Sequence, residues 1–83
     1  MPKQIVTATF IGQNGSCGYI TGRTYMLVIE HKKGFNIKIH IVKGDGYCRY
    51  SSIISFLQNW DDIKVFPSVQ AHKIIEEDQK HHN

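Results

Sequence analysis

The residues of this chain best suited to binding chemistry are basic and aromatic, and most of them lie close together in the sequence. Lys38, Tyr47, Arg49 and Tyr50 occupy one short stretch. Positive charges attract phosphate or carboxylate groups, and the rings offer flat surfaces for stacking, so these residue types suit an anionic partner. Tyr and Arg also dominate protein-binding hot spots. Together with Arg23, these four residues form the predicted partner-binding or ligand-binding set.

Charge is distributed unevenly along the 83 residues. Residues 1–60 hold seven Lys/Arg and two acidic residues, whereas residues 61–83 hold three Lys and five acidic residues. A basic body followed by an acidic tail suits contact with nucleic acid or with an acidic protein surface. The plainer alternative is that the charge keeps a small domain in solution and that lysines discourage strand edges from pairing.

A glycine-rich stretch near the N-terminus, GQNGSCG, invites a phosphate-binding interpretation. It lacks the lysine and the following helix of a P-loop, so a catalytic nucleotide site is not predicted. The simpler interpretation is a flexible first loop of the fold. A loop that folds over a ligand stays open as an alternative, and its candidate residues are Gln13, Asn14, Gly15, Ser16 and Gly18.

Cysteine, histidine and carboxylate spacing does not match a catalytic or metal-binding pattern. Cys17 and Cys48 stand 31 positions apart, far from the close spacing of zinc ligands. Neither cysteine adjoins a base that would activate its thiol. We therefore expect that the chain is not an enzyme and that it holds no cofactor and no metal.

The same residues bear on cellular location. No apolar run approaches the ~20 residues that span a bilayer, and the N-terminus lacks the apolar region of a secretory signal. These features predict a cytoplasmic protein with no membrane partner. In a reducing cytosol, two distant cysteines are expected to be free thiols rather than a disulfide, with Cys48 buried.

Alternating apolar residues predict a mainly-β domain over residues 1–67. Asp45-Gly46 suits a type I′ turn between the third and fourth strands, and a short helix is expected at about residues 52–61, before the last strand. The order of these elements predicts an SH3-like, five-stranded small barrel. The expected strands cover residues 4–11, 23–32, 35–42, 47–50 and 63–66. The polar tail, residues 68–83, is open to three interpretations: a helix, an edge strand or a disordered end.

The predicted core combines one face of each strand with an apolar stripe on the helix. Ile53, Leu57 and Trp60 recur at helical spacing and are expected to close one end of the barrel. The remaining core candidates are Val6, Ala8, Phe10, Tyr25, Leu27, Ile29, Ile37, Ile39, Ile41 and Cys48.

The second strand is apolar on both faces, and a small barrel buries only one of them. Met26 and Val28 lie on the outward face and are the candidate oligomer interface, because exposed apolar patches mark interaction sites. A homodimer is one expected arrangement. The alternative is that the tail covers this face with Val69, Ile74 and Ile75.

Residues 8–63 resemble a group of small SH3-like proteins carried by phages and prophages of Gram-positive bacteria. The resemblance rests on three short motifs, which are structural rather than catalytic. They are Phe10-Ile11-Gly12, Gly22-Arg23-Thr24-Tyr25, and Tyr50-Ser51-Ser52 with Phe56, Asn59 and Trp60.

This resemblance implies an accessory task in a bacterial host cell. The leading hypothesis is a counter-defence or host-takeover protein that binds and inhibits a host bacterial protein. One alternative is sequestration of a nucleotide immune signal between subunits, with residues 13–18 closing over its phosphates. The other is direct nucleic-acid binding.

Overall fold

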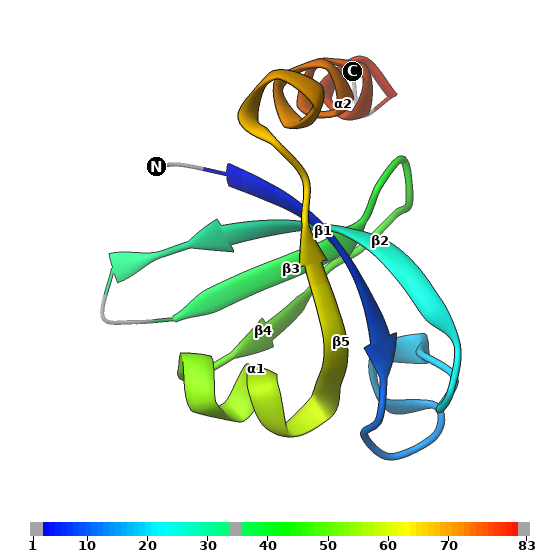
Figure 1. Ribbon diagram of the computed structural model, residues 1–83. Helices are drawn as coiled ribbons and strands as arrows, with labels where there is room; N and C mark the ends of the chain where they lie inside the picture. The colour runs from blue at the N-terminus through cyan, green and yellow to red at the C-terminus, as the bar shows by residue number, and fades with distance from the viewer. Residues whose placement is uncertain (1–2, 34–35, 82–83) are drawn as a thin grey trace.

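The computed structural model describes residues 3–33 and 36–81 (Figure 1). It confirms a mainly-β chain with five strands and the short helix expected at about residues 52–61, it shows that the tail forms a helix over residues 68–81, and it adds a short 3-10 helix, η1. Position 35, the predicted start of the third strand, and positions 82–83 of the tail lie outside the described residues. The elements are β1 (Lys3–Phe10), η1 (Ser16–Gly18), β2 (Thr24–His31), β3 (Ile37–Ile41), β4 (Cys48–Tyr50), α1 (Ile53–Asn59), β5 (Trp60–Val65) and α2 (Ser68–His81).

The strands form one antiparallel sheet in the order β4-β3-β2-β1-β5. The predicted closed barrel is not formed by hydrogen bonding, because β4 and β5 are the two edges of the sheet and do not pair within the described residues. Helix α1 connects these edges, beginning at an N-cap where the Ser52 hydroxyl accepts a hydrogen bond from the Ser55 N–H at 3.1 Å. Figure 1 shows α1 and α2 on opposite sides of the strands.

Trp60 is the centre of the inner core. Its ring lies 5.1 Å from that of Phe10 and 4.9 Å from that of Tyr19, measured between centroids. Its indole Nε1–H donates a hydrogen bond to the Tyr50 hydroxyl at 3.0 Å. The ring of Phe56, in α1, is stacked against the Trp60 ring, with 6.2 Å between the two centroids. Each fully buried large side chain of this kind contributes about 1.5–3 kcal/mol.

The predicted burial of the helical stripe is wrong for two of its three residues. Ile53 and Leu57 are 48% and 51% exposed, and Phe56 is buried in their place. Trp60 is not helical: its φ of −136° and ψ of 139° begin β5, so the strand rather than the helical period directs its side chain. Ile41, at the end of β3, is also exposed rather than buried.

A second apolar cluster lies on the outer face of the sheet, under α2. Ile5 of β1 and Val28 of β2 are fully buried there against Ala71. Of the predicted tail residues, Ile74 and Ile75 pack on this cluster, whereas Val69 is 82% exposed. Helix α2 therefore covers the face that carries Met26 and Val28, and the apolar argument for a dimer through these two residues no longer holds.

Asp78 attaches the far end of α2 to the turn after β3. Its carboxylate is 2% exposed, and it accepts a hydrogen bond from the Lys43 backbone N–H at 2.6 Å. Its second oxygen lies 2.8 Å from Nε2 of His40. Lys43 has a φ of 62°, in the left-handed region that residues with a Cβ seldom adopt. The buried carboxylate thus stabilises an unfavourable backbone conformation while it positions the helix.

The turn between β3 and β4 differs from the prediction. The tight turn spans residues 41–44, closed by a hydrogen bond from the Gly44 N–H to the Ile41 carbonyl at 2.8 Å. Gly46 has a positive φ of 77°, but Asp45 does not, so Asp45-Gly46 is not a type I′ turn. The Asp78 contact to Lys43 supplies a tertiary reason for the earlier turn.

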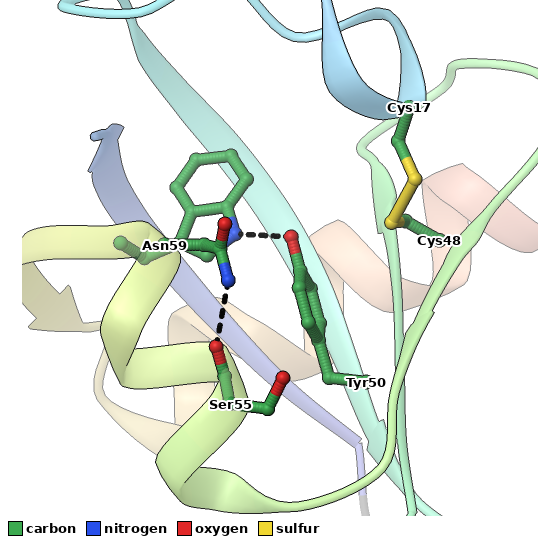
Figure 2. Close-up of a disulfide and its surroundings, with 6 residues drawn as sticks. Cys17, Cys48, Tyr50, Ser55 and Asn59 are labelled. Carbon is green, nitrogen blue, oxygen red and sulfur yellow. Dashed lines mark hydrogen bonds between the residues drawn. A yellow bond between two sulfur atoms is a disulfide. The ribbon is translucent and has the colours of Figure 1, made fainter. Parts of the chain in front are cut away.

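Cys17 and Cys48 form a disulfide, which overturns the expectation of two free thiols. Separation along the chain says little about separation in a fold, and here the two Cα atoms are 6.0 Å apart, within the usual range for a disulfide. The bond joins η1 to the first residue of β4 (Figure 2). Cys48 is buried as predicted, and Cys17 is exposed.

We expect Asp78→Ala to lower the free energy of unfolding by about 1–3 kcal/mol, because two hydrogen bonds to a buried carboxylate are lost. Urea denaturation followed by circular dichroism measures this change. Glu77→Ala is the matched control on the same helix: its carboxylate is exposed and lies 3.7 Å from the Lys43 ammonium, so its effect should stay within about 0.5 kcal/mol. Equal effects of the two substitutions would contradict this role of Asp78.

Reduction of the Cys17–Cys48 bond should lower the free energy of unfolding by about 2–4 kcal/mol, because the unfolded chain regains the freedom of a 31-residue loop. Melting curves with and without dithiothreitol give the difference. The double variant Cys17→Ser/Cys48→Ser is the control and should not respond to dithiothreitol. Two thiols alkylated in the oxidised, denatured protein would show that the bond does not form.

Candidate functional site

Lys38 and Arg49 carry like charges directly across a strand pair. Lys38 of β3 is in register with Arg49 of β4, so the two side chains lie on the same face of the sheet. The neighbouring residues Ile37 and Ile39 point into the inner core, which leaves Lys38 and Arg49 on the outer face. Like charges directly opposite one another destabilise a sheet. A bound anion would relieve this repulsion.

Tyr47 lies against both cations. The Lys38 ammonium is 4.4 Å from the centroid of its ring, and the Arg49 guanidinium carbon is 5.3 Å away. Cation–π contacts at exposed sites contribute about 0.5–1 kcal/mol each, so the ring partly offsets the repulsion. The ring itself is 57% exposed. We call Lys38, Tyr47 and Arg49 the basic–aromatic face.

A hollow of about 320 Å³ adjoins this face. We call it the basic pocket, and it is bounded by Lys32, Lys33, Asn36, Ile37, Lys38 and Arg49. Four of these six residues are cationic and none is acidic. The backbone at its rim is held by a hydrogen bond from the Lys32 N–H to the Asn36 carbonyl at 2.8 Å. The Asn36 amide donates a second, to the Lys33 carbonyl at 3.3 Å.

Among the described residues, Glu30 is the acidic residue that forms an ion pair with a residue of the basic pocket. It lies opposite Lys38 on β2 and forms an ion pair of 3.0 Å with Lys32. Partial burial of its carboxyl acts to raise its pKa. The hydrogen bond from Lys32 and the charges of Lys3, Lys32 and Lys38 outweigh burial, so the pKa lies below its usual value of 4.5. The direction of this shift agrees with the three lysines that surround the Glu30 carboxyl.

The structure separates the five predicted partner-binding residues. Tyr50 faces the inner core, where its ring contacts Phe56 at 5.7 Å and burial raises its pKa despite the hydrogen bond from Trp60. Arg23 precedes β2 and lies seven residues before Glu30, which is about 23 Å along the strand at about 3.3 Å per residue, so it is at the opposite end of β2 from the Lys32 end. Lys38, Tyr47 and Arg49 alone come together.

The loop of residues 13–18 uses its backbone donors internally. The N–H groups of Gly15, Ser16 and Gly18 donate to the carbonyls of Tyr19, Gln13 and Gly15 at 2.7, 3.0 and 2.9 Å. The side chain of Asn14 accepts from the Thr21 N–H at 3.0 Å. A phosphate-binding loop presents such N–H groups to the ligand instead. The loop contains no basic residue, and the disulfide fixes it to β4 beside Tyr50 (Figure 2).

The basic pocket was not predicted from the sequence, although Lys32 and Lys33 lie in the basic part of the chain. Asn36 carried no signal of its own. The available clue was the spacing of Lys32, Lys33 and Lys38 on the two sides of an expected hairpin, which brings them together when the strands pair.

Across residues 3–33 and 36–81, no three His, Cys, Asp or Glu side chains are grouped so as to hold a metal ion. In that same part of the chain, no helix has the length and apolar character needed to cross a membrane.

The lowered pKa of Glu30 predicts a pH-dependent effect of Glu30→Gln. A carboxyl with a lowered folded-state pKa stabilises the fold above its unfolded pKa and loses that contribution as pH falls through the folded value. The variant should therefore melt below the wild type at pH 7, and this difference should shrink below its usual pKa of 4.5. Asp45→Asn, an exposed carboxylate, is the control. A difference that is constant from pH 7 to pH 2 would exclude the ion pair as its cause.

No protein-family model, no curated protein and no solved structure matches this chain.

Proposed function

We propose that this chain is a non-catalytic, phage-type accessory protein that binds and inhibits a host bacterial protein. The SH3-like assignment is part of this proposal. Its support is the element order, with four strands, a short helix and a fifth strand, and the convergence of motif residues on one aromatic cluster. Phe10, Tyr25, Phe56 and Trp60 from the three motifs all belong to the inner core or pack against it.

The observation that carries the binding proposal is the cross-strand pair Lys38 and Arg49, with Tyr47 against both. Arg49 is exposed and Lys38 is half-buried, and Glu30, opposite Lys38 on β2, offsets only part of the repulsion between the two cations. An acidic patch on a partner would remove that repulsion and bury the Tyr47 ring. Tyr and Arg at the centre of a contact are typical hot-spot residues. The partner we propose is therefore a host protein with an acidic surface.

The two alternative functions draw on different features. Nucleic-acid binding also uses basic residues beside an exposed ring, so it competes for the basic–aromatic face. Sequestration of a nucleotide between subunits would use the loop of residues 13–18 to bind the phosphates and an uncovered outer face of the sheet to join the subunits. The loop's occupied N–H groups and the cover provided by α2 count against that version.

We also propose that the protein acts in the cytoplasm of the host cell, where its target would lie. The Cys17–Cys48 disulfide counts against this location, because disulfides that persist in the cytosol of mesophiles are rare, and those that form there are usually transient. Alkylation of thiols in protein taken directly from the host cell tests this location. A disulfide that is fully formed in the cell would place the protein in an oxidising compartment and would contradict the proposal.

The binding proposal predicts that charge reversal at Lys38→Glu/Arg49→Glu reduces capture of the host protein at least about tenfold, because both cations would then repel an acidic patch. The measurement is a pull-down from nuclease-treated bacterial lysate, followed by an activity assay of the captured protein with wild type and variant. Lys73→Glu/Lys80→Glu on α2 is the matched control for net charge and should keep full capture.

Three outcomes would decide against inhibition of a host protein. Equal capture by both charge-reversal variants would show that the basic–aromatic face is not the contact. Capture that disappears with nuclease treatment would favour nucleic acid. A captured protein whose activity is unchanged by the wild-type chain would refute inhibition.

A further inference from the structure

We infer that the basic pocket is a binding site for a phosphorylated small molecule, whose phosphate is bound by Lys33, Lys38 and Arg49. This inference goes beyond the proposed function, because it requires no host protein. The ligand class follows from three properties of the pocket: uncompensated charge, concave shape and the types of donor that surround it.

Charge in the basic pocket is largely unneutralised. Of its four cations, Lys32 alone forms an ion pair among the described residues, with Glu30 at 3.0 Å, and Glu30 also lies opposite Lys38 on β2 and attracts its charge. Lys33, Lys38 and Arg49 have no ion pair in that part of the chain. Three cations around one hollow repel one another, and a phosphate with two negative charges would neutralise most of this excess.

The basic pocket shares Lys38 and Arg49 with the basic–aromatic face, but it differs from that face in being concave. A concave site of about 320 Å³ is at the lower end of the size range of small-molecule pockets. A protein surface patch would contact the exposed Tyr47 ring and the outer parts of Lys38 and Arg49. A hollow with cations on several sides instead suits a compact anion that enters it, and the phosphate group is compact and multiply charged.

The donor types also suit phosphate. Arg49 offers a planar fork that matches two phosphate oxygens, whereas Lys33 and Lys38 act as flexible point charges. The Asn36 amide and the Lys32 N–H hold the rim through their hydrogen bonds to the backbone. The backbone of Lys32 and Lys33 is therefore held before a ligand arrives, which limits the backbone entropy lost on binding.

A ligand larger than a phosphate group can extend beyond the basic pocket along the same face. A second hollow, of about 230 Å³, is bounded by Lys38, His40, Gly46 and Tyr47 and shares Lys38 with the basic pocket. A ring attached to the phosphate would reach this second hollow and contact Tyr47. Phosphate esters that carry a planar ring, such as nucleoside monophosphates, fit this pair of hollows.

Isothermal titration of the purified full chain with pyrophosphate, adenosine monophosphate and adenosine tests the inference. We expect both phosphorylated probes to bind, with affinity that falls as salt rises, and adenosine to bind at least about tenfold more weakly because it has no phosphate. Absence of binding by both phosphorylated probes, or equal binding of adenosine, would overturn the inference.

Substitutions assign the binding to the pocket. Arg49→Gln and Lys33→Gln should each weaken pyrophosphate binding about five- to tenfold or more, because each removes a charge-assisted hydrogen bond. Arg23→Gln and Lys73→Gln are the matched Arg and Lys controls outside the pocket and should bind as the wild type does. Glu30→Gln should increase affinity by about two- to fivefold, since it removes the nearby carboxylate. A misfolded variant cannot produce a gain in affinity, so this result separates binding from folding.

Nuclear magnetic resonance then locates the ligand. Pyrophosphate should shift the backbone amide signals of residues 32, 33, 36–38 and 49, and leave those of residues 13–18 unchanged. Shifts confined to residues 13–18 would place the anion in the glycine loop and refute the pocket. None of these measurements involves a host protein, so failure here and failure of the proposed inhibition are distinguishable.

Discussion

The contacts of Trp60 are the interaction on which the rest of this structure depends. One indole ring contacts rings from β1, β2, α1 and the segment after η1, and its N–H bonds to Tyr50 of β4. The edges β4 and β5 do not pair within the described residues, so this cluster, with α1, is what holds the two ends of the sheet in one body. It also explains Gly12: a Cβ there would clash with the Asn59 side chain and the Phe10 ring.

The outer face of the sheet is divided between the acidic tail and the candidate site. Over one half, α2 covers the apolar cluster, and its carboxylates meet His40 and Lys43. Over the other half, Lys38 and Arg49 lie beyond the reach of any acidic group of α2 for which a contact is seen. The acidic tail therefore contacts one part of the basic body, at His40 and Lys43, and makes no such contact with Lys38 and Arg49 among the described residues.

Much of the fold could be predicted from the sequence, because alternation along a strand reports directly which side chains are buried. Leu27, Ile29, Ile37 and Ile39 are in the inner core as expected. Prediction failed where one element gives way to another: Ile53 and Leu57 were misplaced because the helical period was extended through Trp60, which begins a strand. The candidate site was predicted in part. Strand pairing places Lys38 beside Arg49, whereas Tyr50, one residue further along β4, faces the core.

The sequence alone determined the class of structure, the basic character of the body and the residue types available for binding, because composition and short-range period are local properties. The tertiary structure alone decided which of those residues meet. Cys17 reaches Cys48 across 31 positions, and Asp78 reaches His40 across 38. Such contacts depend on how strands and helices pack at long range, and packing is determined by the whole set of buried side chains rather than by any one segment. The basic pocket exists for the same reason: its residues come from β3, from β4 and from the segments on either side of the β2–β3 turn, and none of these carries it alone.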